Sequence, residues 1–126
     1  MTVNEAIVQA DKLKPNMYAL KEKVGWLNTL DGTIFRETVL AHERPVGAPE
    51  EFVPYDPDGD LEDVLIAPHP YDTVYVYWLQ SQYDLNNAEL AKYNTSAALY
   101  NQALAEFTAW YNRTHKPIRK ILAIRI

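Results

Sequence analysis

The feature that most constrains this chain is a proline-rich stretch in its middle. Residues 45–70 contain six of the eight prolines in the 126-residue sequence. Proline fixes φ and lacks an N–H group, so this stretch cannot form a long helix or a central strand. We predict a long irregular connection here, with one short turn over 61–66. Regular structure is therefore expected only in residues 1–44 and from residue 71 onward.

The same connection is strongly acidic. Residues 45–72 hold eight carboxylates and no basic side chain, while residues 115–126 hold four basic side chains and no acid. The chain has a net charge of −5, whereas proteins that grip nucleic acid usually present a basic face. We therefore identify the acidic loop itself as the candidate functional segment. Its central carboxylates are Asp56, Asp58, Asp60, Glu62 and Asp63.

Residues 1–44 predict two helices. Thr2 and Glu5 have the spacing of a capping box, and Pro15 ends the first helix because proline disfavours helical geometry in the residue before it. The second helix is expected over about 18–43. Its apolar stripe is Leu20, Val24, Leu27, Leu30 or Asp31, and Ile34. Asp31-Gly32 is also a hairpin signal, but the residues after it do not alternate as a strand would.

Residues 71–114 return to helical spacing. The predicted core stripe is Tyr71, Tyr75, Trp78, Gln82, Leu85, Glu89, Tyr93, Ala97, Tyr100, Leu104, Phe107 and Tyr111. As one helix this segment would be about 66 Å long at 1.5 Å per residue. That length is too great for a compact domain of this size. Either the helix breaks near 86–96, or the chain is an elongated subunit of an assembly.

The aromatic side chains of this region do not favour nucleic-acid binding. Base-stacking platforms are accompanied by basic residues that follow the phosphates, and residues 71–111 contain only Lys92. Tyrosine and tryptophan are enriched at protein interfaces. We predict that Tyr77, Tyr83 and Trp110, which lie off the stripe, face a partner. The alternative is that all the rings pack in the core of one chain.

The last residues, PIRKILAIRI, read as a short strand because Leu122, Ile124 and Ile126 alternate with other residues. One strand in a helical chain has no internal partner. We therefore predict that the tail contacts another subunit. Its candidate interface residues are Ile118, Ile121, Leu122, Ile124 and Ile126.

No catalytic, cofactor or metal site is predicted. The chain has no cysteine, which excludes thiol chemistry and fits a reducing compartment, and its three histidines lack metal-ligand spacing. Asp56, Asp58 and Asp60 resemble the start of a calcium loop, but the glycine and the final acid of such a loop are misplaced. A metal-dependent enzyme built on these three residues is the weakest alternative. No signal peptide or membrane span is expected.

Several stretches resemble the head–tail connector proteins (adaptor, or head-completion, proteins) of tailed phages and prophages of Firmicutes. The likeness covers about residues 1–117. It rests on WLNTLDGTIFRETV, on PYDPDGDLEDVLIAPHPYD and on the Y-N-x-S/T and Y-N-R-T-H motifs of the following helical region. These motifs concern turns and packing, and no catalytic residue is carried over with them. The apolar ending of this chain differs from the hydrophilic ending expected of the family.

The resemblance implies a non-enzymatic, mostly helical subunit without a cofactor. About a dozen copies would form a ring between the portal protein and a tail-completion protein, and DNA would pass through without sequence-specific binding. The protein would be in the host cytoplasm during assembly and then at the head–tail junction of the virion. We expect a single all-α domain over 1–126: a bundle of about four helices, a long acidic loop and a strand-like tail. The alternative function is a small helical adaptor that binds another protein as a monomer or dimer.

Overall fold

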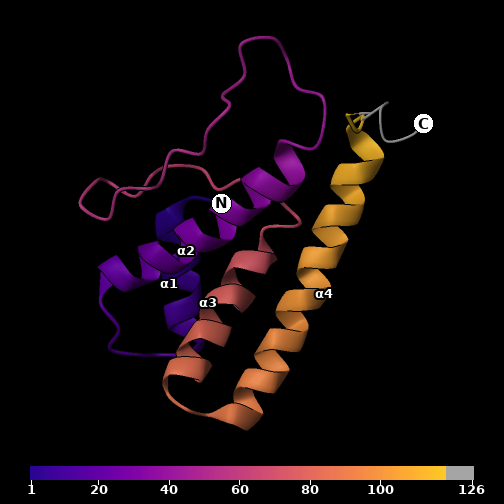
Figure 1. The fold of residues 1–126 in the computed structure, drawn as a ribbon. Helices are drawn as coiled ribbons and strands as arrows, with labels where there is room; N and C mark the ends of the chain where they lie inside the picture. The colour runs from indigo at the N-terminus through magenta and orange to yellow at the C-terminus, as the bar shows by residue number, and fades with distance from the viewer. Residues whose placement is uncertain (119–126) are drawn as a thin grey trace.

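The structure, a computed structural model, describes residues 1–118 (Figure 1). These residues form four α-helices and no strand, as the sequence predicts. The helices are α1 (Val3–Leu13), α2 (Leu20–Ile34), α3 (Thr73–Asn86) and α4 (Leu90–Thr114), and a π-helical segment, η1 (Phe35–Val39), continues α2. The predicted strand falls almost entirely in residues 119–126, outside the described part of the chain. Among the described helices, none is long and apolar enough to cross a membrane.

Helix α1 begins with the predicted capping box. The Thr2 N–H donates to Oε1 of Glu5 at 2.8 Å, and the Glu5 N–H donates to Oγ1 of Thr2 at 3.1 Å. The helix ends before Pro15, with Lys14 as its non-helical cap. Its buried face consists of Val3, Ala6, Ile7 and Ala10. The box and the proline therefore set both ends of α1, as expected from sequence.

The second predicted helix, 18–43, is shorter and less regular than expected. It runs as an α-helix to Ile34 and then as a π-helix to Val39. The Asp31-Gly32 pair lies inside α2, so the hairpin alternative is wrong. Both members of the Leu30–Asp31 alternative are buried, and Leu20, the first residue of the predicted stripe, is exposed. The helix tolerates its two glycines because packing outweighs a cost of about 1 kcal/mol for each.

The helical region 71–114 is divided into two helices, which is the first of the two alternatives that the sequence left open. Helix α3 ends at Asn86, Ala88 takes a left-handed backbone conformation with φ of 59°, and α4 starts at Leu90. The two helices fold back on one another as an antiparallel hairpin (Figure 1). The chain is therefore a compact bundle and not one extended helix.

The predicted stripe on α3 is only partly correct. Tyr75 is fully buried, but Leu79 and Tyr83 are also fully buried, whereas Leu85 is exposed. The reason is that α3 packs against α4 on one side and against α1 and α2 on the other. A helix covered on two sides buries more than one stripe, so a single line of residues could not describe it.

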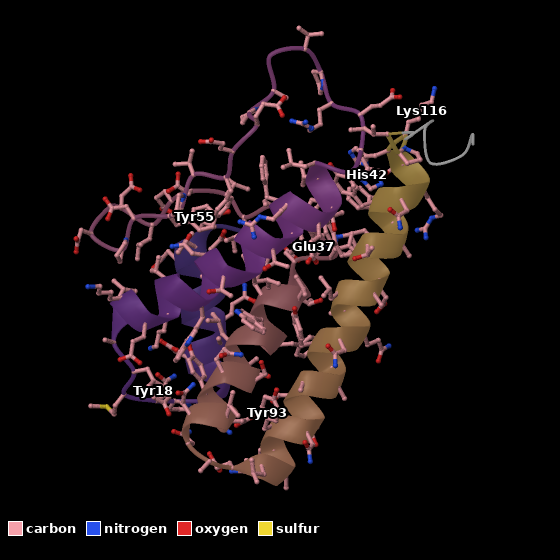
Figure 2. All side chains as sticks on the ribbon, viewed as in Figure 1. Tyr18, Glu37, His42, Tyr55, Tyr93 and Lys116 are labelled. Atoms are coloured by element: carbon pink, nitrogen blue, oxygen red, sulfur yellow. The ribbon has the colours of Figure 1, made fainter. Side chains whose placement is uncertain are left out.

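The short segments that follow η1 and α4 are joined by backbone hydrogen bonds. The Glu43 N–H donates to the Lys116 carbonyl at 2.8 Å, and the Ile118 N–H donates to the Ala41 carbonyl at 3.0 Å. These bonds form an isolated antiparallel bridge between His42 and Pro117. His42 and Lys116 lie close together at this end of the bundle (Figure 2). The segment that follows η1 is thus held to the segment that follows α4.

Candidate interaction surface

A buried carboxylate, Asp31, anchors the acidic loop. Its side chain is fully buried on α2. Oδ2 accepts from the Tyr55 hydroxyl at 2.6 Å and from the Ile66 N–H at 3.1 Å, and Oδ1 accepts from the Tyr75 hydroxyl at 2.6 Å. Burial raises the pKa of Asp31, and the hydrogen bonds from both tyrosines and from Ile66 oppose that rise. One side chain therefore ties together α2, α3 and two points of the loop.

Further bonds hold the same loop along its length. The Asn28 side chain both donates to the Tyr55 carbonyl, at 3.1 Å, and accepts from the Tyr55 N–H, at 2.7 Å. The Ala67 N–H donates to the Tyr75 hydroxyl at 2.7 Å. Residues 61–65 do not form the predicted turn but run beside the start of α1, with the Val3 N–H donating to the Asp63 carbonyl at 3.0 Å. The loop from 55 to 67 is therefore fixed to the bundle.

The predicted acidic residues all face solvent. Every side chain of this set is exposed: Asp56, Asp58, Asp60, Glu62 and Asp63. Asp56 accepts from the Asp58 N–H at 2.9 Å and Asp60 from the Glu62 N–H at 3.0 Å, so two of these carboxylates form local turns. Within residues 1–118, the structure has no group of three potential metal ligands. The arrangement is an anchored, solvent-facing cluster of negative charge.

Tyr83, predicted to face a partner, is instead fully buried. Its hydroxyl donates to Oδ1 of Asp11 at 2.7 Å, and Oδ2 of Asp11 accepts from the Lys23 ammonium at 2.8 Å. Partial burial would raise the pKa of Asp11, but these two donors, together with Asn16, lower it. Tyr83 thus links α3 to α1 inside the bundle, which explains why a residue off the predicted stripe is not available to another subunit.

The other predicted interface residues have mixed positions. Tyr77 and Trp110 are half-buried, and the Trp110 ring stacks on Tyr71 with ring centroids 5.1 Å apart. Ile118 is 45% exposed. Ile121, Leu122, Ile124 and Ile126 lie outside the described residues. Among the described candidates, the side chains with surface left for a partner are therefore Tyr77, Trp110 and Ile118.

A second buried carboxylate, Asp84, joins α1 to the hairpin. It pairs with the Lys14 ammonium and accepts from the Ser96 hydroxyl at 2.8 Å. Beside it lies an open hollow of about 500 Å³ between the end of α1 and the start of α4. The charged groups of this hollow pair with one another, since Lys92 also contacts Glu89 at 2.7 Å. Its polar lining is therefore explained by the packing of the helices.

A groove with both apolar and polar lining runs between the α2–η1 segment and α4, and we refer to it as the α2–α4 groove. It encloses about 310 Å³. Its lining residues are Thr29, Leu30, Thr33, Ile34, Glu37, Thr38, Trp78, Tyr100, Leu104 and Thr108. The Trp78 indole N–H donates to the Trp26 carbonyl at 2.8 Å, which fixes the ring. Figure 2 places Glu37 on the side of the α2–η1 segment that faces α4.

The sequence reasoning missed the three aspartates that organise the bundle and also missed the α2–α4 groove. A signal was present only for Asp31, because a carboxylate within an apolar stripe must find buried donors. Asp11 and Asp84 depend on partners more than 10 positions away, and their role was not visible in local spacing.

No protein-family model, curated protein or solved structure matches this chain.

Proposed function

We propose that this protein is a subunit of a phage or prophage head–tail connector. It would join the portal protein to the tail-completion protein and extend the channel through which DNA passes. The proposal rests on the resemblance over residues 1–117. The anchored acidic loop is the observation that supports it most directly, because carboxylates held in one position on each subunit would form a fixed band of negative charge around a ring. No enzymatic activity, cofactor, sequence-specific DNA contact or membrane association belongs to the proposal.

The effect of the acidic loop would grow with the number of copies. Residues 45–72 carry eight carboxylates without a base, and a ring repeats that charge in every subunit. The summed field of such a ring reaches beyond single contacts and repels phosphates from nearby surfaces. A loop on the lumen side would keep DNA from adhering, and a loop on an outer side would attract a basic partner surface.

Contacts between subunits would be heterologous, as in any closed ring of identical chains. Helix α4 packs mainly on α3, and it exposes Leu90 and Leu99 on its surface. We assign the ring contact to this surface of α4 together with Tyr77, Trp110 and the C-terminal segment. Removal of residues 118–126 is therefore expected to weaken ring formation while helicity, measured by circular dichroism, is largely kept.

The decisive experiment is copurification with the portal protein of the same prophage, with the mass of the complex read by light scattering. We expect many copies of this chain on each portal ring. A matched variant with Asp56, Asp58 and Asp60 changed to Asn tests whether the acidic loop faces the partner, since those side chains make no contact between helices. A compact monomer that never associates with the portal would refute the connector function.

The alternative is a protein-binding adaptor that acts as a monomer or dimer. The α2–α4 groove favours it, because a groove lined by aromatic and aliphatic side chains with threonines around them suits a helix or an extended peptide. The two functions differ in stoichiometry. An adaptor would bind its partner one to one or two to two, whereas a connector subunit would bind as a ring.

A further inference from the structure

The pairing of the two chain ends sets the direction in which the C-terminal segment leaves the bundle. Residues 116–118 run antiparallel to residues 41–43, from Lys116 opposite Glu43 to Ile118 opposite Ala41. A chain that continues in this direction runs back toward residue 40 and then along η1. The next feature along that path is the α2–α4 groove, whose near end includes Thr38 and Thr108.

The segment has the length that the groove requires. From Ala41 back to Thr29, the far end of the groove, the helical path is about 18 Å at 1.5 Å per residue. Eight residues, 119–126, span about 26 Å when extended at 3.3 Å per residue. The segment is therefore long enough to run along the whole groove of its own chain.

The chemistry of the segment also fits the groove. Its sequence, RKILAIRI, begins with two bases and continues with mainly apolar residues. The groove has the Glu37 carboxylate near its entrance, while Trp78, Tyr100 and Leu104, which are only partly buried, line it with apolar surface. A segment entering beside Ala41 would bring Arg119 and Lys120 to the carboxylate first. Its leucine and isoleucines would then reach the apolar part.

We propose that residues 119–126 occupy the α2–α4 groove of their own chain in the free protein. The segment covers the apolar lining, and Glu37 pairs with its first two bases. This inference does not rest on the connector function. If the chain does form a ring, the segment reaches a neighbouring subunit only after leaving this groove, so the two arrangements are alternatives.

Disulfide trapping tests the proposal directly, because the natural chain contains no cysteine. Thr33 is exposed at the rim of the groove, and its hydroxyl donates to the Thr29 carbonyl of its own helix. Thr33 lies about 12 Å along the helix from Ala41, and Leu122 would lie about 13 Å along an extended chain from Ile118, the residue bonded to Ala41. A protein carrying both Thr33→Cys and Leu122→Cys is therefore expected to form an intramolecular disulfide on mild oxidation. It would migrate as a compact monomer on a non-reducing gel, in a yield independent of protein concentration.

The matched control pairs Leu122→Cys with Thr95→Cys. Thr95 is also an exposed threonine whose hydroxyl bonds within its own helix, to the Ala91 carbonyl at 3.4 Å. It precedes Thr114, the end of α4, by 19 positions, a distance of about 28 Å along the helix axis. We expect at least tenfold slower intramolecular trapping for this pair. Circular dichroism of both reduced proteins verifies that each is folded.

A third variant tests the ionic contact. Adding Glu37→Lys to the Thr33→Cys and Leu122→Cys protein places a base where the segment brings Arg119 and Lys120, so trapping should slow several-fold at low salt. Equal trapping rates for the groove pair and the control pair would overturn the proposal. So would disulfides that form only between chains, with a dimer band that rises with concentration. These outcomes concern the isolated chain and leave portal binding to its own test.

Discussion

The hydroxyl of Tyr75 lies 2.6 Å from Oδ1 of Asp31, and this bond joins α3 to α2 across 44 positions of sequence. The same hydroxyl accepts from the Ala67 N–H, so the bond extends to the end of the acidic loop. Burial and the neighbouring Asp31 raise the pKa of Tyr75 well above its usual range, which keeps the hydroxyl protonated as a donor. The position of the loop on the bundle therefore depends on a buried polar network.

Replacing Tyr75 with Phe is expected to lower the free energy of unfolding by about 1–3 kcal/mol, because the Asp31 carboxylate loses a donor and the Ala67 N–H loses its acceptor. Urea denaturation measures the change. Tyr77→Phe on the same helix is the control, since Tyr77 is half-buried and its hydroxyl makes no hydrogen bond to another residue of the described range 1–118. Equal stability of the two variants would mean that the Asp31 network does not hold the loop.

Asp31→Asn is expected to change the pH dependence of stability. The pKa of Asp31 is raised in the folded chain, so its contribution is fully present below the unfolded pKa of about 3.9 and is lost as pH rises through the folded pKa. The extra free energy of unfolding of the natural protein over Asp31→Asn should therefore shrink as the pH rises above the unfolded pKa, as measured by urea titrations at several pH values. Asp58→Asn, at an exposed position, serves as the control. If the stability difference between the natural protein and Asp31→Asn instead grows with pH, the pKa of Asp31 is lowered and not raised by folding.

Lys14→Met should destabilise the protein by about 1–3 kcal/mol, because it leaves the Asp84 carboxylate buried without its cation. This loss is smaller than the loss expected on breaking a fully buried ion pair, since 22% of the Lys14 side chain remains exposed. Thermal and urea unfolding measure it, with the exposed Lys12→Met as the control. A loss no greater than that of Lys12→Met would place the pair among the weak surface ion pairs.

Trp78→Ala should lower the free energy of unfolding by about 3 kcal/mol, because it opens a cavity beside Tyr100 and removes the donor to the Trp26 carbonyl. Val53→Ala, at a side chain that is 77% exposed, is expected to cost little and serves as the control. The measurement is the midpoint of urea denaturation. An unchanged midpoint would show that the floor of the α2–α4 groove contributes nothing to stability.

A metal-dependent enzyme built on the acidic loop would be stabilised by its metal ion, whereas we expect no such stabilisation. Calcium, magnesium or manganese at millimolar concentration should leave the melting temperature unchanged, since the Asp56 and Asp60 carboxylates accept from local backbone N–H groups and the Asp58 side chain is exposed. Differential scanning calorimetry with each ion and with EDTA measures this. An increase that depends on ion concentration, and that disappears when Asp56, Asp58 and Asp60 are changed to Asn, would restore a metal site to this loop.

Local chemistry explains where sequence reasoning succeeded. The box at Thr2 and Glu5, the stop before Pro15 and the break after α3 follow from hydrogen bonds and backbone limits within a few residues. Reasoning failed on α3 because its covered surface depends on neighbours from both halves of the chain. Tyr83 shows this most clearly, since its partner Asp11 is 72 positions away.

The sequence by itself determined the helical class, the irregular acidic connection and the separation of charge, because each depends on residue type and short-range spacing. Only the tertiary structure decided which carboxylates are buried and which face solvent. Asp31 and Asp58 are chemically identical, yet Asp31 is fully buried among donors from α3 and the loop while Asp58 is exposed. That difference arises because the energy of a charge depends on the groups that the whole fold places around it.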